Sequence, residues 1–374
     1  MAKILMVNVP YAGHINPTLA LAKELVAHGH DVAYVNSERF RDVTELTGAR
    51  FIPYADYPVD VKGYEEARLC FRAAYNTALG LKESFDLLIY EMLFYPGMKI
   101  AEKLHIPAVR QFSQPVWKKD SSLRERIAAI RACDKIQRQF MSRADAAHMG
   151  LQGASLVKAI AYDQPAFNIV YVSELFQRDR QGIGDDYIFT VPPLAQRIDI
   201  EPITYEGMTR PLIYISLGSI VSDKRFYEKC LKAFSSQPWS VILNTARVDQ
   251  ADLGPIPSNI HIYSYVPQVD VLTHADVFVT HCGMNSVNEA MSVGVPMVGV
   301  PVMNDEQSNA ERLVELGLGR RVRSRRVSGA QLVDAVRQVL ADPAIRQRSA
   351  EVKARLAGED RMDEVVARIE ALLA

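Results

Sequence analysis

The sequence predicts an α/β protein built from two doubly wound, Rossmann-like domains that face each other across a cleft. The chain has 374 residues, which is long for a single hydrophobic core. Apolar, β-branched segments alternate with helix-like segments, and this alternation is typical of parallel sheets covered by helices on both faces. It weakens over residues 195–210, which are polar and contain proline, and then begins again. We therefore expect an amino-terminal domain over residues 1–205, a carboxyl-terminal domain over 206–360 and a terminal helix over 361–374 that braces the domains.

The first half contains the clearest helix signals. Asn16 suits an N-cap, Pro17 the first helical position and Gly29 the residue beyond the end, which predicts a helix between them. By the same reasoning, we predict strands at residues 3–9, 31–35, 86–91 and 107–112, and further helices at 38–48 and 95–105.

The second half repeats this alternation of strands and helices. We predict strands at residues 212–219, 240–246, 260–266, 275–280 and 296–301, and helices at 224–236, 285–294, 308–317 and 363–374. In doubly wound sheets, ligands bind at the carboxyl ends of the strands. The turns that follow these strands are therefore the places to look for functional residues.

Composition excludes several classes of protein. The formal net charge is -1, so no global field favours nucleic acid or acidic lipid. Five arginines over residues 320–326 are interpreted as an exposed strand and loop. The four cysteines are scattered, which argues against zinc and disulfides and suits a reducing compartment. No secretory signal or membrane-spanning stretch is visible. We expect a cytoplasmic protein with no nucleic-acid partner; its oligomeric state is not indicated.

The turn in THCGMNSVNEAMSVGVP, residues 280–296, has the chemistry of an anion site. Gly283 allows close backbone approach, and Asn285 and Ser286 stand at or near the N-cap of the following helix, whose amides and dipole favour phosphate. His281 adds a donor, and Glu289 could accept hydrogen bonds from a ribose diol. A well-capped turn without a ligand would explain Asn285 and Ser286, but neither His281 nor Glu289.

Residues 265–310 contain YVPQVDVL, THCGMNS and GVPMVGVPVMNDEQSNA. This segment resembles the donor-binding signature of nucleotide-sugar-dependent natural-product glycosyltransferases, the two-domain GT-B family. The opening PYAGHINPTLALAKELVAHGH resembles the bacterial, macrolide-type branch, and the resemblance extends over nearly the whole chain. It implies a GT-B fold and a UDP-sugar as co-substrate, with no other cofactor and no metal.

The resemblance also implies roles for individual residues. Tyr265 matches the aromatic residue that stacks on the base, and Val266 and Gln268 match positions near the base edge. The remaining matches are the diphosphate contacts His281, Gly283, Asn285 and Ser286, the ribose contact Glu289, and Ser219 as a hydroxyl beside the phosphate.

The sugar-binding positions depart from the family pattern. Asp305 matches the sugar-binding carboxylate, but Glu306 stands where Gln is usual, and Gln307 follows it. Either Glu306 contacts the sugar, or a local shift brings Gln307 into its place. Two carboxylates favour a neutral hexose, glucose first, and disfavour a uronic acid. Deoxysugars on thymidine diphosphate are the weaker alternative.

His14, in PYAGHINP, matches the family's general base, and histidine is the residue whose ordinary pKa suits that task. Glu91 matches the carboxylate that orients the imidazole, where Asp is usual; alternatively, it caps the following helix. The implied reaction is a single inverting displacement, with charge on the leaving phosphate stabilised by His281 and the helix amides. The sequence has no Asp-x-Asp metal motif.

Aromatic residues in the first domain suggest a small apolar or aromatic acceptor, such as a macrolide, flavonoid or polyketide, although most of them belong to the core in the ordinary case. They are Phe71, Tyr75, Phe94, Tyr95, Phe112, Trp117 and Phe140. Two other functions are disfavoured. The histidine of GHINP and the aromatic first domain argue against a nucleotide-sugar epimerase, and an intact His14 with a complete diphosphate set argues against a non-catalytic donor-binding subunit.

Overall fold

The computed structural model divides the chain into two compact units. Unit 1 comprises Met1–Pro193 and Asp360–Ala374, and unit 2 comprises Leu194–Glu359. The division therefore falls before residue 205, where the sequence suggested it. The structure describes residues 1–58, 64–116, 137–138, 140–178, 180, 182–191, 203–218, 223–302, 304–323 and 326–374.

Unit 1 is built on a seven-stranded sheet with the order β3-β2-β1-β4-β5-β6-β7. Every neighbouring pair is parallel. The order grows outward in both directions from β1 and β4, so the switch point lies between these two strands. The strands are β1 Lys3–Val7, β2 Asp31–Asn36, β3 Arg50–Pro53, β4 Leu87–Glu91, β5 Ala108–Phe112, β6 Phe167–Val170 and β7 Tyr187–Phe189.

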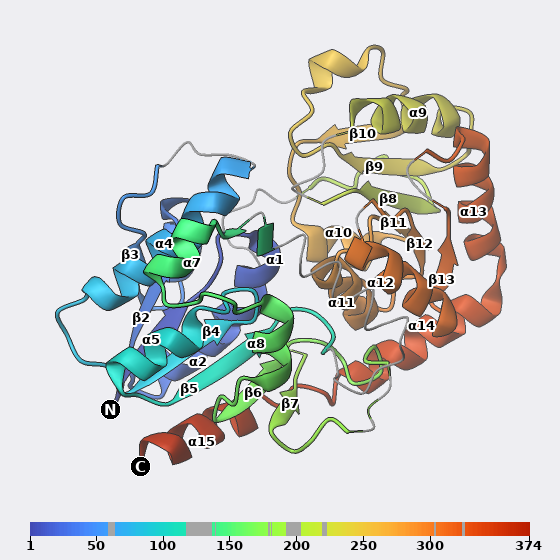
Figure 1. Cartoon of the computed structure of the whole chain (residues 1–374). Coiled ribbons are helices and arrows are strands. Elements are labelled where there is room, and N and C mark those ends of the chain that lie inside the picture. Colours follow the sequence, from blue (N-terminus) through green and yellow to red (C-terminus); the bar gives the residue numbers. More distant parts are fainter. Residues whose placement is uncertain are drawn as a thin grey trace. The chain divides into compact units, whose positions relative to one another are not determined.

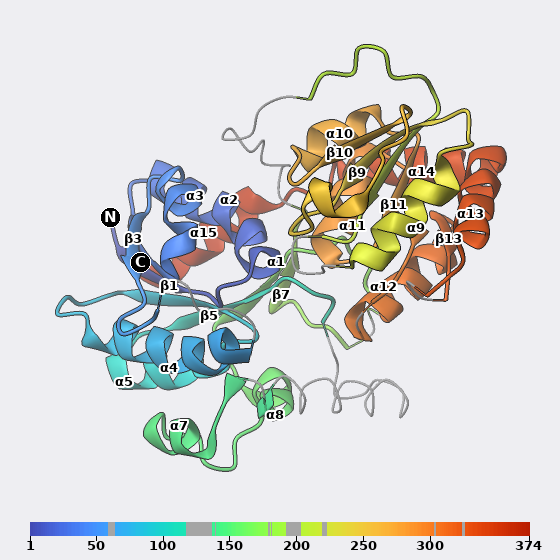
Figure 2. The ribbon, with the colours of Figure 1, turned by 90° about the horizontal axis from the view of Figure 1, so that it is seen from above.

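Helices cover both faces of this sheet. Figure 2 shows α2, α3 and α15 on one face and α4 and α5 on the other. The helices are α1 Ala12–Ile15, α2 Leu19–Ala27, α3 Arg41–Glu45, α4 Tyr64–Gly80, α5 Gly97–Leu104, α7 Arg143–His148, α8 Leu156–Tyr162 and α15 Met362–Leu373, with 3-10 turns η1 Asn16–Thr18 and η2 Glu38–Phe40.

The terminal helix α15 contributes to the core of unit 1. Its buried residues Val365, Val366 and Ile369 belong to the same hydrophobic cluster as Leu21 and Leu25 of α2. The chain thus returns to its first unit after completing the second, and both termini lie in unit 1 (Figure 1).

Unit 2 is built on a six-stranded sheet with the order β10-β9-β8-β11-β12-β13, again parallel throughout. Its switch point lies between β8 and β11. The elements are β8 Leu212–Ser216, α9 Lys224–Phe234, β9 Ser240–Asn244, η3 Gln250–Leu253, β10 Ile260–Tyr263, α10 Gln268–His274, β11 Val277–Thr280, α11 Met284–Val293, β12 Met297–Gly299, α12 Asn304–Glu315, β13 Gly319–Arg321, α13 Gly329–Ala341 and α14 Pro343–Leu356.

The two doubly wound α/β units agree with the predicted fold class, but two helix starts differ from the prediction. The first helical segment begins at Ala12, and Asn16 has helical dihedrals (φ −51°, ψ −43°) instead of capping the helix. Helix α11 begins at Met284 with Gly283 as its N-cap, so Asn285 and Ser286 lie inside its first turn. Within the described ranges, no helix has the length and apolar character needed to cross a membrane.

Candidate active site

The side chains of His14 and Glu91 meet at the switch point of the first sheet. Strand β1 ends at Val7 and leads into α1, which carries His14, while Glu91 is the last residue of β4. Because the carboxyl ends of adjacent parallel strands share one edge, the two residues come together. Nδ1 of His14 lies 2.8 Å from Oε1 of Glu91. The sequence suggested this partnership, and the longer glutamate side chain reaches the imidazole.

Glu91 is fully buried and its carboxylate is held on both oxygens. The backbone N–H of Leu93 donates to Oε2 over 2.8 Å. Glu91 therefore accepts a hydrogen bond from the turn after β4 and contacts His14 at the same time, but it does not cap the following helix, which was the alternative role considered for it. The N-cap of the following helix α5 is Pro96, not Glu91.

Ser113 is a third member of this cluster that sequence reasoning missed. It follows β5, the neighbour of β4, and its Oγ lies 2.9 Å from Nδ1 of His14 and 3.2 Å from Oε1 of Glu91. Ser113 directly follows β5, and β1, β4 and β5 are consecutive neighbours in the sheet. A polar residue at the carboxyl end of the third of these strands is a signal that could have identified it.

These contacts define the tautomer of His14. A carboxylate only accepts hydrogen bonds, so Nδ1 carries the proton that faces Glu91, and Nε2 keeps its lone pair. The imidazole retains 17% exposure. The arrangement can accept a proton at Nε2, because the carboxylate stabilises the imidazolium that forms.

A buried polar network supports the backbone of His14. Nδ2 of Asn8 donates to the carbonyl of His14 over 3.3 Å and to Oγ1 of Thr18 over 3.0 Å. The Tyr34 hydroxyl lies 2.7 Å from both Asn8 Nδ2 and Thr18 Oγ1. Burial raises the pKa of Tyr34, which keeps its phenol neutral.

Aromatic side chains adjoin His14 within unit 1. Tyr11 lies edge-on to His14 and to Phe140, with ring centroids 6.3 and 5.8 Å away. Phe140 in turn contacts Phe71 at 4.9 Å, and Phe71 contacts Tyr95 at 5.8 Å. Phe94 completes this cluster, whereas Phe112 packs against Tyr187 and Tyr75 against His148; Trp117 lies outside the described residues.

In unit 2, the turn after β11 presents the start of α11 without a side-chain cap. Gly283 is the N-cap, and among the described residues its own position provides no side-chain cap. Asn285 and Ser286 lie near the N-cap, as predicted, but neither of them is the cap. Because the amides of a first turn have no intrahelical acceptor, the start of this helix can bind an anion.

His281 is packed between two glycines. A Cβ at Gly218 would lie 2.7 Å from its Cε1, and a Cβ at Gly283 would lie 2.4 Å from its Nε2. Glycine is thus required at 283 by the imidazole, in addition to any ligand. Burial lowers the pKa of His281 to about 4, so the ring is neutral near pH 7. Its Nδ1 has no hydrogen-bond partner among the described residues.

Gln268, Ser286 and Glu289 form one hydrogen-bonded network. Nε2 of Gln268 donates to Oγ of Ser286 over 3.1 Å and to Oε2 of Glu289. Its Oε1 accepts from the hydroxyl of the buried Tyr214 over 2.9 Å, a partner that the sequence did not reveal. The Gln268 amide therefore faces Ser286 and Glu289, and its place near the base edge stays a prediction.

Tyr265, Val266 and Cys282 differ in exposure. The Tyr265 side chain is 46% exposed, as a stacking platform requires, while Val266 belongs to the core. Cys282 is buried, and burial raises the pKa of its thiol, as is typical of a cysteine that packs as a small hydrophobic residue.

The first turn of α12 separates the three sugar-binding candidates. Asp305 is exposed, whereas Glu306 is buried and its Oε2 accepts from the backbone N–H of Val302 over 2.6 Å. Oε1 of Gln307 lies 3.5 Å from Nη1 of Arg321. Glu306 thus holds the loop after β12. Ser219 lies outside the described residues.

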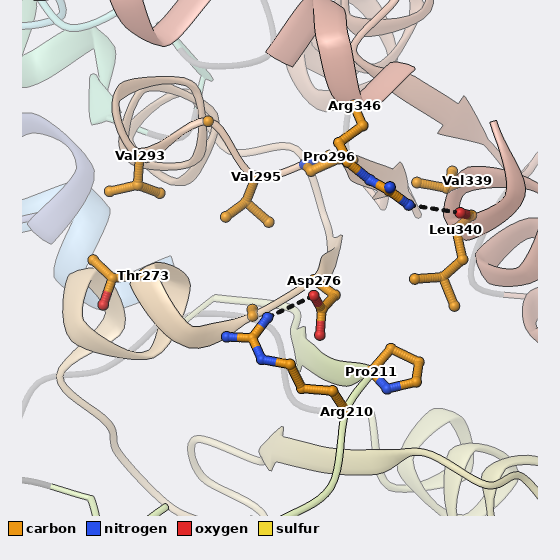
Figure 3. A pocket seen from close by; sticks show the side chains of 12 residues that line it. Arg210, Pro211, Thr273, Asp276, Val293, Val295, Pro296, Val339, Leu340 and Arg346 are labelled. Carbon is orange, nitrogen blue, oxygen red and sulfur yellow. Dashed lines mark hydrogen bonds and ion pairs between the residues drawn. The ribbon is translucent and has the colours of Figure 1, made fainter. Parts of the chain in front are cut away.

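A cavity of about 550 Å³ lies at the amino ends of the strands of the second sheet, away from the carboxyl ends that lead into the predicted donor residues (Figure 3). Its lining includes Pro211, Asp276 and Pro296, which precede β8, β11 and β12, and Asp276 pairs with Arg210 over 2.7 Å. None of the predicted donor residues that the structure describes lines it. Within the described part of the chain, no group of three His, Cys, Asp or Glu side chains could hold a metal ion.

Comparisons with known proteins agree with this architecture. The chain is 30% identical to the NDP-glycosyltransferase YjiC of Bacillus subtilis (strain 168) over 391 residues, 99% of this chain and 97% of that protein. The solved glycotransferase of kitacinnamycin matches with a TM-score of 0.85 and 29% identity, covering 100% of this chain and 99% of that one. CalG4, the calicheamicin glycosyltransferase, matches with a TM-score of 0.80 and 26% identity, covering 100% and 98%.

The fold is GT-B, and the protein is a glycosyltransferase. A family model described as "UDP-glucoronosyl and UDP-glucosyl transferase" matches residues 193–353. Together with the full-length similarity to YjiC, this shows that the chain belongs to the UDP-glycosyltransferase family.

Proposed function

We propose that this glycosyltransferase moves a neutral hexose, glucose first, from a UDP-sugar to a hydroxyl of an apolar or aromatic natural product. The reaction inverts the anomeric carbon and needs neither a metal ion nor a further cofactor. The observation that carries the proposal is the contact between Nδ1 of His14 and the buried carboxylate of Glu91, because it leaves Nε2 as a base.

The chemistry is a single displacement. Nε2 of His14 takes the proton of the acceptor hydroxyl, whose oxygen forms a bond to the anomeric carbon while the bond to the diphosphate oxygen breaks. The first-turn amides of α11 and His281, a neutral hydrogen-bond donor, stabilise the charge that develops on the leaving diphosphate. Metal independence follows in this proposal, because these groups perform the task otherwise given to a cation.

The donor and acceptor assignments rest on separate observations. The exposed ring of Tyr265 suits stacking on a base, and Glu289, held by Gln268, suits a ribose diol. The aromatic cluster that reaches His14 through Tyr11 supports an apolar or aromatic acceptor. The names of the solved relatives, which refer to kitacinnamycin and calicheamicin, agree with a natural-product acceptor.

A donor screen tests this proposal. We expect UDP-glucose to raise the melting temperature more than UDP-glucuronate or dTDP-deoxysugars, since a ligand stabilises the state that binds it. Transfer to a phenolic acceptor should persist in EDTA and yield the inverted anomer. The proposed donor would be contradicted by a preference for dTDP-deoxysugars. Inversion would be contradicted by a product that retains the anomeric configuration, and metal independence by loss of transfer in EDTA. Conversion of the donor alone would indicate an epimerase, and binding without transfer a non-catalytic subunit.

A further inference from the structure

We propose that Ser113 is a positioning residue that holds the imidazole of His14 and tunes its basicity through Glu91. This inference rests on the proposed role of His14 as the base. Ser113 is only 1% exposed, so its hydroxyl acts through its two neighbours and not by touching a substrate.

The three side chains form a closed triangle. Nδ1 of His14 and Oε1 of Glu91 are 2.8 Å apart, and Oγ of Ser113 lies 2.9 Å from the first and 3.2 Å from the second. One placement of hydrogens satisfies all three contacts. The Nδ1–H group is shared between Glu91 and Ser113, and the Ser113 hydroxyl donates its own hydrogen to Glu91.

The hydroxyl matters because the Glu91 carboxylate is buried without a cationic side chain. Among the residues that the structure describes, no lysine or arginine forms an ion pair with Glu91. A buried carboxylate is costly unless hydrogen bonds replace its hydration. The donors seen here are the Leu93 amide, Ser113 and His14. Removing Ser113 leaves a larger share of the charge to be balanced by His14, which favours the imidazolium.

The surroundings allow this effect to be read from a pH profile. Among the described residues of unit 1, the other titratable groups with a recorded contact to the triangle are the phenols of Tyr11 and Tyr34. Phenols ionise near pH 10, and burial raises the pKa of Tyr34 further. Neither phenol changes charge on the acidic limb of the pH profile. A shift of the acidic limb of kcat/KM therefore reports the environment of His14.

The test compares Ser113→Ala with Ser113→Thr and with a matched control, Ser173→Ala. Ser173 is equally buried, follows β6 of the same sheet, and accepts a hydrogen bond from the Leu175 amide, but does not touch the triangle. For Ser113→Ala we expect kcat to fall about fivefold or more, which corresponds to the loss of one net hydrogen bond. Donor KM should change little, and the acidic limb should move to higher pH. Ser113→Thr should restore kcat and the position of the acidic limb, and Ser173→Ala should change neither of these two.

Further variants separate this inference from the function on which it rests. In the His14→Ala background, Ser113→Ala should add no further loss, because Ser113 acts through the imidazole. If His14→Ala is inactive but Ser113→Ala keeps the rate and pH profile of the unchanged protein, the inference fails while the proposed function stands. If His14→Ala remains active, the proposed function itself fails. Should Ser113→Ala not fold, Ser113→Cys replaces it, since a thiol is a weak donor of similar size, and an unchanged profile in that variant would again overturn the inference.

Discussion

The hydroxyl of Tyr214 donates a hydrogen bond to Oε1 of Gln268 over 2.9 Å, and this contact fixes which end of the amide faces Glu289. Without it, the amide could rotate and present its oxygen to the Glu289 carboxylate. Two acceptors would then face each other, and Glu289 would lose the donor that orients it. Tyr214 thereby connects the strand β8 to the predicted ribose contact on α11.

Tyr214→Phe should consequently weaken donor binding. Losing one buried hydrogen bond costs about 1 kcal/mol, or about a fivefold rise in donor KM, with a smaller change in kcat. The matched control is Tyr227→Phe, because the Tyr227 hydroxyl is buried in the same unit and has no hydrogen-bond partner within the described ranges. Steady-state kinetics with UDP-glucose decides the matter. Equal KM values in both variants would show that Tyr214 does not orient the donor site.

His14→Ala should abolish transfer and leave nucleotide affinity nearly unchanged. Loss of a positioned general base costs about 10²–10⁴-fold in rate, whereas the predicted diphosphate contacts belong to the other unit. Glu91→Gln should cause a smaller loss, since an amide oxygen can still accept from Nδ1. Transfer rates and UDP titration by calorimetry provide the two readouts. Substantial activity in His14→Ala would require another base.

Gly283→Ala should disturb the diphosphate site through His281. The added Cβ would lie 2.4 Å from Nε2, so the imidazole or the turn has to move. We expect a lower melting temperature and weaker UDP binding. Gly358→Ala is the control, because its nearest neighbour would be 3.7 Å away.

A double variant identifies the cause. In a His281→Ala background the clash disappears, so Gly283→Ala should then cost little stability. If the cost is the same with and without the imidazole, glycine is needed at 283 for another reason, such as the approach of a ligand.

Local sequence signals predicted the two doubly wound units and the turn after β11, because apolar alternation and glycine placement depend on neighbours in the chain. Contacts between strand ends that are far apart in the sequence could not be predicted in this way. Ser113 and Tyr214 are ordinary residues of predicted strands or their ends, and only the sheet order brings them to His14 and Gln268. The cap itself, Gly283, was not identified for a similar reason. A capping residue type was preferred over Gly283, whose small size is demanded by His281 across the turn.

The depressed pKa of His281 should make stability depend on pH. In the folded protein, burial lowers this pKa from 6.5 to about 4. Between these values the unfolded chain binds the extra proton, so the contribution is complete above about pH 6.5 and is lost as pH falls toward 4. It amounts to about 1–3 kcal/mol, and to less of that range because His281 as a residue is only partly buried.

Urea denaturation between pH 7 and pH 4.5 measures this dependence. His281→Gln should flatten it, and His261→Gln, which changes a histidine of β10 outside the turn, should not. Parallel curves for the unchanged protein and His281→Gln would show that His281 is not held neutral. Diphosphate binding should also take up protons in this range, because the anion favours the imidazolium.

The last prediction concerns the choice of donor sugar. Asp305 is exposed at the start of α12, while the Glu306 carboxylate is buried against the Val302 amide. Asp305 is therefore the carboxylate better able to meet sugar hydroxyls. A uronic acid about 4 Å away would be repelled by up to about 4 kcal/mol at an effective dielectric near 20, and by less where water screens Asp305.

A competition assay with UDP-glucose, UDP-glucuronate and one phenolic acceptor should show strong preference for glucose. Asp305→Asn should narrow that preference, because it removes the charge and keeps the shape. Glu306→Gln should preserve it, since the glutamine oxygen can still accept from Val302. Comparable turnover of both donors by the unchanged protein would mean that Asp305 does not face the sugar, and loss of the preference in Glu306→Gln alone would assign the selectivity to Glu306 instead.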